Sequence, residues 1–184
     1  METVRNLDVA GVWDDVPIAE KNTVIAVLTS PESTYEESQQ RWAAGGFWHT
    51  NGEDLSKGDV EKWLHGLAPA LAECGVELRV ATVDPCELGS PGYAVAVNGK
   101  TLELYRFDLA DPRSPATEDP WLDCSLVPAA EVNRLLAAAG SDRRLALIWP
   151  GSQDGIAVLG PEGALRAAAP SVEVDEDGLG FVIP

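Results

Sequence analysis

Short apolar runs and alternating patterns along this 184-residue chain predict a protein with many strands. Apolar residues that alternate or cluster over a few positions are typical of strands. They occur over residues 23–29, 76–83, 92–107, 144–149, 155–160 and 164–169. Asn98–Gly99, between two alternating runs, predicts a hairpin with a type I′ turn. The stretches "SVEV" and "GFVI" around "DEDGL" predict a last hairpin near the carboxyl terminus.

Apolar residues at helical spacing, together with capping residues, predict three helices. The first is expected over residues 30–44, with Ser30 as its N-cap. The second is expected to begin at Ser56, to bend or break at Pro69 and to end at Gly75. Its buried face is formed by Val60, Trp63, Leu64, Leu67 and Leu71. The third is expected over residues 128–139.

Two parts of the chain resemble each other. Gly75 and Pro85 match Gly140 and Pro150 at one offset, and "GYAVAVNGKTL" matches "GIAVLGPEGAL" at a similar one. Chance alternation can imitate such a repeat, but the shared glycine and proline positions favour duplication. The pattern predicts an α+β fold, mainly antiparallel, with helices on one face and two duplicated α-β-β-β halves.

The length is suited to a single domain over residues 1–184. Within it, 23–107 and 121–184 would be the two halves, joined by the proline-rich linker 108–120. A cleft between such halves is the default place for a ligand or a partner.

The net charge of −17 is spread over the whole chain, and 45% of the residues are hydrophobic. A uniformly negative protein repels nucleic acid and anionic lipid and attracts basic protein surfaces. Solubility alone is the other explanation of this acidity. We found no signal-peptide pattern at the start, no apolar run near the roughly 20 residues of a membrane span, and no disulfide framework among three cysteines. These features favour a cytoplasmic protein that binds neither nucleic acid nor membrane.

The chain offers few residues for catalysis. The weak catalytic candidates are His49, Asp84 and Cys86. A cysteine nucleophile needs a histidine close by, and acidic neighbours raise the pKa of a thiol and lower its reactivity. An ordinary loop cysteine explains Cys86 equally well. Two histidines, His49 and His65, without metal-binding spacing predict no metal site, and no cofactor motif occurs. His65 follows Glu61 by one helical turn and is expected to be its exposed ion-pair partner.

The connector "FWHTNGED", residues 47–54, combines aromatic and acidic residues. We expect Phe47 and Trp48 to pin it to the core and His49 to be partly exposed. Together with a second acidic and aromatic stretch, it gives the candidate partner-binding residues: Trp48, His49, Glu53, Asp54, Trp121 and Asp123.

The hypothesis favoured by the sequence is a protein-binding module that inhibits a basic protein stoichiometrically, as bacterial immunity proteins neutralise toxins. An enzyme or small-molecule binder that uses the cleft between the halves is the first alternative. A structural or scaffolding subunit is the second, and a homodimer is compatible with each of them.

Overall fold

The computed structural model describes residues 46–85, 92–106, 119–153, 155–172 and 180–184, and single residues 9, 11, 12, 14, 18 and 22. The strand expected over 23–29 and the helix expected over 30–44 lie outside them. The strands are β1 (Phe47–His49), β2 (Val80–Asp84), β3 (Gly92–Val97), β4 (Lys100–Arg106), β5 (Arg143–Ile148), β6 (Ile156–Pro161) and β7 (Phe181–Val182). The helices are α4 (Gly52–Asp54), α5 (Val60–Glu73), α6 (Pro120–Ala138) and α7 (Glu162–Ala168), with a π-turn η1 (Leu55–Asp59) and a 3-10 turn η2 (Ala169–Ser171).

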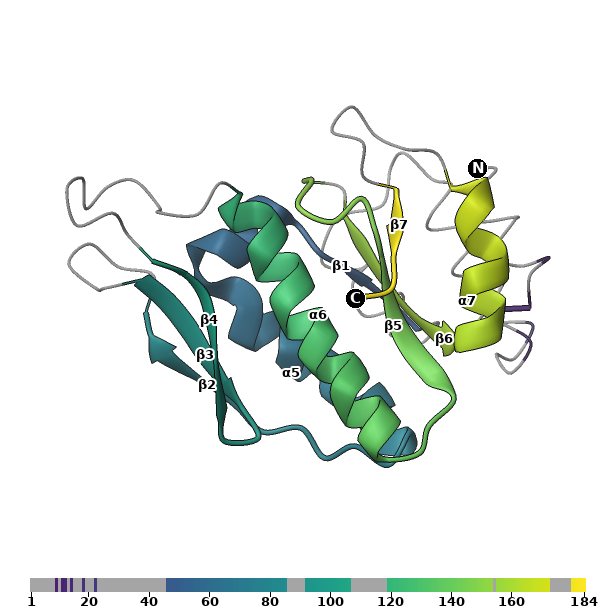
Figure 1. Ribbon diagram of the computed structural model, residues 1–184, viewed down its shortest axis with the longest axis horizontal. Coiled ribbons are helices and arrows are strands. Elements are labelled where there is room, and N and C mark those ends of the chain that lie inside the picture. Colours follow the sequence, from purple (N-terminus) through teal and green to yellow (C-terminus); the bar gives the residue numbers. More distant parts are fainter. Residues whose placement is uncertain are drawn as a thin grey trace.

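Two antiparallel sheets enclose helices between them, which confirms the α+β class (Figure 1). One sheet has the strand order β2-β3-β4 and the other β1-β6-β5-β7. Helix α6 packs against both β4 and β5, and α5 packs against β2 and β1. Helix α7 covers the opposite face of the four-stranded sheet (Figure 1). The expectation that all helices share one face is therefore wrong for that sheet.

The four-stranded sheet is buried on both faces. Along β5, Leu145 and Leu147 belong to the core shared with α5 and α6, and Ala146 and Ile148 belong to the core shared with α7. This division follows from the alternation of side chains along a strand. A strand buried on both sides appears in the sequence as a continuous apolar run, as "LALI" does.

The three-stranded sheet is buried mainly on its inner face. Val95 and Leu102 face the central core, whereas Thr101 and Glu103 are exposed on the other side of the sheet. The hairpin between β3 and β4 has the predicted turn, with φ of 49° at Asn98 and 84° at Gly99. Both angles are positive, as a type I′ turn requires, so this prediction is confirmed.

The helical segment around α5 begins earlier than its sequence suggests. Asn51, not Ser56, is the N-cap of the first turn, and its side chain accepts a hydrogen bond from the Asp54 N–H at 3.1 Å. Ser56 lies inside η1. Helix α5 continues through Pro69, whereas its end at Gly75, which has a φ of 80°, is confirmed.

Helix α6 also begins earlier, at Pro120 instead of near Pro128. Asp119 caps it by accepting a hydrogen bond from the Leu122 N–H at 2.9 Å, and Pro120 occupies the first helical turn. Aspartate followed by proline is a strong helix start, but the surrounding prolines suggested a linker. Cys124, whose neighbours look like a strand face, is buried within this helix.

The expected third strand of the second half is a helix. Residues 164–169 fall mostly in α7, where alanine, leucine and arginine favour helix and Glu162 pairs with Arg166 one turn later. The halves are thus β-α-β-β-β and α-β-β-α, and β1 of the first half pairs with β6 of the second half in the four-stranded sheet. No duplication is evident in the described residues.

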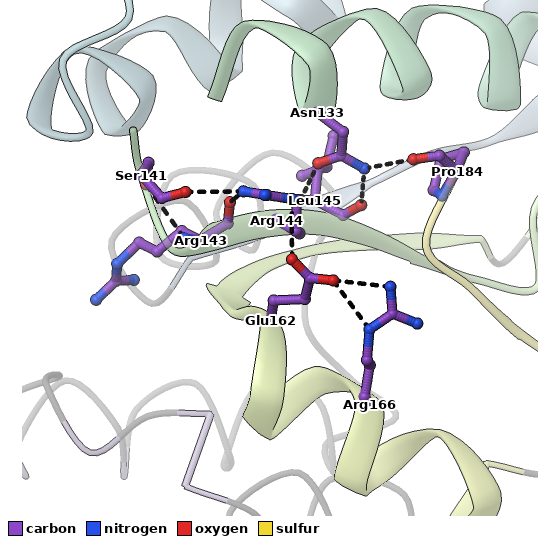
Figure 2. Close-up of polar contacts among 8 residues, drawn as sticks. All are labelled: Asn133, Ser141, Arg143, Arg144, Leu145, Glu162, Arg166 and Pro184. Atoms are coloured by element: carbon purple, nitrogen blue, oxygen red, sulfur yellow. Dashed lines mark hydrogen bonds and ion pairs between the residues drawn. The ribbon is translucent and has the colours of Figure 1, made fainter. Parts of the chain in front are cut away.

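A buried asparagine joins α6 to the four-stranded sheet (Figure 2). The Asn133 side-chain amide donates to the Leu145 carbonyl at 2.9 Å and accepts from the Leu145 N–H at 2.7 Å. The same amide nitrogen donates to the Pro184 carbonyl at 2.9 Å. Strand β7 pairs with β5 at Leu147 and Ile148, and at Leu145 the Asn133 side chain makes the hydrogen bonds that a neighbouring strand would make.

Candidate functional site

The segment from β1 to α5 forms a small cavity beside the connector predicted as a site. Its volume is about 80 Å³, and it lies within the first of the two expected halves. The lining residues are Trp48, His49, Asn51, Asp54, Leu55, Asp59, Lys62, Trp63 and Gly66. Ligand pockets for drug-sized molecules measure about 300–1,000 Å³, so this cavity suits a single side chain or a similarly small group.

The two aromatic residues of β1 hold the connector in place. Phe47 is buried in the core against α7, and Trp48 is buried in the central core. The Trp48 indole N–H donates to the Gly66 carbonyl of α5 at 3.0 Å. The prediction that both aromatics pin the connector is therefore confirmed. His49, next along the strand, is partly exposed as expected and lines the cavity.

A sharp turn brings the acidic residues to the cavity. Gly58 has a φ of 122°, a conformation that favours glycine, and it lies inside η1, between α4 and α5. The turn allows Asp54, which precedes it, and Asp59, which follows it, to line the same cavity. Asp59 also accepts a hydrogen bond from Lys62 at 3.2 Å, at a half-exposed position.

Backbone hydrogen bonds fix the connector against the turn between β5 and β6. The Thr50 N–H donates to the Gly155 carbonyl at 2.7 Å, and the Gly52 N–H donates to the Ser152 carbonyl at 2.9 Å. A Cβ atom at Gly52 would lie 2.6 Å from the Gly151 carbonyl oxygen and 2.9 Å from Trp121 Cβ. Glycine at this position thus permits close contact between three segments of the chain.

The predicted partner-binding residues therefore lie in one region. Trp121 packs beside Gly52, and Asp123 lies in the first turn of α6. Glu53 accepts a hydrogen bond from the Gln153 side chain at 2.9 Å and pairs with Lys57. The hydrogen bond from Lys57, followed by that from Gln153, holds the pKa of Glu53 below its usual range. Glu53 is consequently charged at neutral pH.

The weak catalytic candidates are not brought into one cavity. Asp84 ends β2 and lines a separate cavity of about 40 Å³, together with Tyr93, Tyr105 and Arg106. His49 lines the cavity beside α5, and Cys86 lies outside the described residues. Within the ranges that the structure describes, no three histidine, cysteine, aspartate or glutamate residues form a group that could hold a metal ion.

Sequence reasoning missed several members of the site. Asn51 is followed by Gly52, a pair that is typical of a turn, although an asparagine before a helical segment is also an N-cap signal. Trp63 was assigned to the core by its spacing; it is indeed buried, and it also lines the cavity. No sequence pattern identified Lys62 as a cavity residue, because its position depends on the turn at Gly58.

Helices of the described parts of the chain are too short or too polar to cross a membrane. Comparison of the chain with models of protein families, with curated proteins and with solved structures finds no match.

Proposed function

We propose that this chain is a protein-binding module that neutralises a basic protein by binding it stoichiometrically, in the manner of an immunity protein. The observation that carries the proposal is the cavity beside α5, where Asp54 and Asp59 lie next to Trp48 and Trp63. Aromatic walls and carboxylates in a cavity of about 80 Å³ suit the end of one lysine or arginine side chain.

The negative charge of the chain acts on a basic partner at a longer distance than contacts in the cavity do. The net charge of −17 attracts a basic partner over several ångströms and accelerates encounter. Glu53, Asp59 and Glu61 lie on the exposed or half-exposed side of the connector and α5. Long-range attraction and one anchored side chain together give a complex that is fast to form, specific and sensitive to salt.

The test uses the purified full chain to retain proteins from the organism that encodes it at low ionic strength. We expect one basic protein to be retained in a 1:1 ratio and released by salt. The double variant Asp54→Asn, Asp59→Asn should weaken that complex about tenfold or more. The matched control is Glu77→Gln, Glu103→Gln, which removes the same charge at exposed sites outside the cavity.

If the partner is a toxin, adding the chain should abolish its activity at an equimolar ratio. Equal weakening by both double variants would show that net charge acts without the cavity. Failure to retain any basic protein would contradict the proposal.

A further inference from the structure

Strand β2 is one of the two edge strands of the three-stranded sheet within the described residues. Backbone groups of an antiparallel strand alternate between the neighbouring strand and the open side. Arg79 exchanges hydrogen bonds with Asn98, whose N–H donates to the Arg79 carbonyl at 2.8 Å. The Thr82 N–H, by contrast, points away from β3 and toward α5. Val80 and Thr82 therefore present backbone groups to the open side of the sheet.

A carboxylate occupies the place that an added strand would use. Glu61 of α5 accepts hydrogen bonds from the Thr82 N–H at 2.8 Å and from the Thr82 hydroxyl at 2.6 Å. A carbonyl oxygen of a fourth strand would accept from the same N–H. The Glu61 side chain is 36% exposed, so water can hydrate its carboxylate when a strand takes its place.

The open edge faces a groove. Residues Gly58, Glu61, Lys62, His65 and Thr82 line a hollow of about 390 Å³ between α5 and β2. Lys62 lines this groove and also the tryptophan-walled cavity, so the two hollows adjoin. An extended segment lying along β2 would therefore pass beside the cavity that we assign to a basic side chain.

The net charge of the chain distinguishes between two segments that could bind at this edge, one from a second copy of the chain and one from a basic partner. Two copies of a chain with a net charge of −17 repel each other, whereas a basic segment is attracted. We propose that an extended, lysine- or arginine-containing segment of the partner adds to β2 as a fourth strand and displaces Glu61 from Thr82. The released Glu61 carboxylate then pairs with a cation of that segment. This inference rests on the proposed function and specifies how the partner binds.

The experiment titrates the full chain with two fluorescent octapeptides of equal charge. One alternates lysine with valine and can form a strand; the other alternates lysine with proline and cannot. We expect the wild-type chain to bind the first about tenfold more tightly. Thr82→Pro should abolish this difference, because it removes the outward N–H, and edge strands tolerate proline there. Thr82→Val keeps the N–H and should keep the difference.

A second measurement covers the case in which Thr82→Pro fails to fold. Amide hydrogen exchange of the wild-type chain should slow at Val80 and Thr82 when the lysine–valine peptide is bound. Equal affinity for both peptides, or unchanged exchange at these amides, would overturn strand addition. Retention of the basic partner by the full chain would still support the proposed function in that case. A dimer of the chain alone that is lost in Thr82→Pro would assign the edge to a second copy and also overturn the inference.

Discussion

The two sheets differ in how their open backbone groups are covered. In the four-stranded sheet, the buried Asn133 side chain satisfies both the N–H and the carbonyl of Leu145. In the three-stranded sheet, the backbone group that Glu61 satisfies is the Thr82 N–H, at a half-exposed position. An amide that both donates and accepts replaces a strand permanently, whereas a hydrated carboxylate covers an edge that can still be used.

The two sheets are expected to differ in their roles, with the four-stranded sheet contributing mainly to stability and the edge of the three-stranded sheet to binding. β5 and β6 are buried on both faces, and burial of apolar side chains stabilises a fold. The three-stranded sheet has an exposed outer face and an edge beside a groove. We therefore expect substitutions at the first sheet to reduce stability and substitutions at the second edge to alter binding.

The largest effect is expected at Asn133. Asn133→Ala leaves the N–H and carbonyl of Leu145 buried without their present partner, and each such group costs about 1–3 kcal/mol. We expect the free energy of unfolding in urea to fall by about 2–4 kcal/mol. Asn51→Ala is a control at a half-exposed cap, where about 1 kcal/mol is expected. Equal losses would show that water reaches the Leu145 backbone groups in Asn133→Ala. The edge at Leu145 would then not be more closed than the edge at Thr82.

The second effect concerns the other side of α6. The Glu131 carboxylate is 2% exposed and binds Arg134 at 2.6 Å and Lys100, at the tip of the β3–β4 hairpin, at 2.5 Å. Arg134, and then Lys100, hold the pKa of Glu131 below its usual range. A lowered pKa in the folded state stabilises the protein above the unfolded pKa, which is about 4.3. That stability is lost as the pH falls through the folded pKa.

Glu131→Gln should therefore cost about 1–2 kcal/mol at neutral pH, since its partners are half-exposed, and progressively less as the pH falls below about 4.3. Urea unfolding at pH 7, 4 and 3 measures this. A loss of the same size at all three values would mean that packing, not charge, explains the effect. Asn133 and Glu131 both lie on α6. Their variants therefore compare the contact of α6 with the four-stranded sheet, at Leu145, and its contact with the three-stranded sheet, at Lys100.

Local structure was predicted from the sequence better than the contacts that cover the edges of the two sheets. The Asn98–Gly99 turn, the buried face of α5 and the stop at Gly75 follow from neighbouring residues. Helix α7 was mistaken for a strand, because "ALRAAA" is a short apolar run and the helix propensity of its residues was given too little weight. The hydrogen bond from the Thr82 N–H to Glu61 joins residues far apart in the chain, and no local sequence pattern predicts it.

The candidate site was predicted in part for the same reason. The connector 47–54 was recognised from its own aromatic and acidic residues, and Trp121 was added from a second acidic and aromatic stretch. That Gly52 brings the two together depends on the Gly151 backbone, which is distant in sequence. Lys62 and the groove beside Thr82 likewise appear only when α5 lies against β2.

A smaller effect is expected at the hairpin of the three-stranded sheet. Gly99 has a φ of 84°, and a Cβ atom there would meet nothing within 4 Å. Gly99→Ala thus tests backbone strain alone and should cost about 1 kcal/mol in urea unfolding. Gly163→Ala, also without a close contact but inside α7, should be neutral or stabilising. A cost at Gly163 equal to that at Gly99 would contradict the explanation by positive φ.

The smallest effect on stability is expected at Glu61. Glu61→Ala removes the hydrogen bonds to Thr82, but water can replace them at this exposed edge, so the urea midpoint should stay close to that of the wild type. Amide exchange at Thr82 should nevertheless become faster, because its N–H loses the carboxylate that protects it. Glu77→Ala is the matched control, since Glu77 pairs with Arg79 on the surface and should leave that amide unchanged. A large loss of stability in Glu61→Ala would show that this edge, like the one at Asn133, is a closed part of the fold and not a surface kept available for a partner.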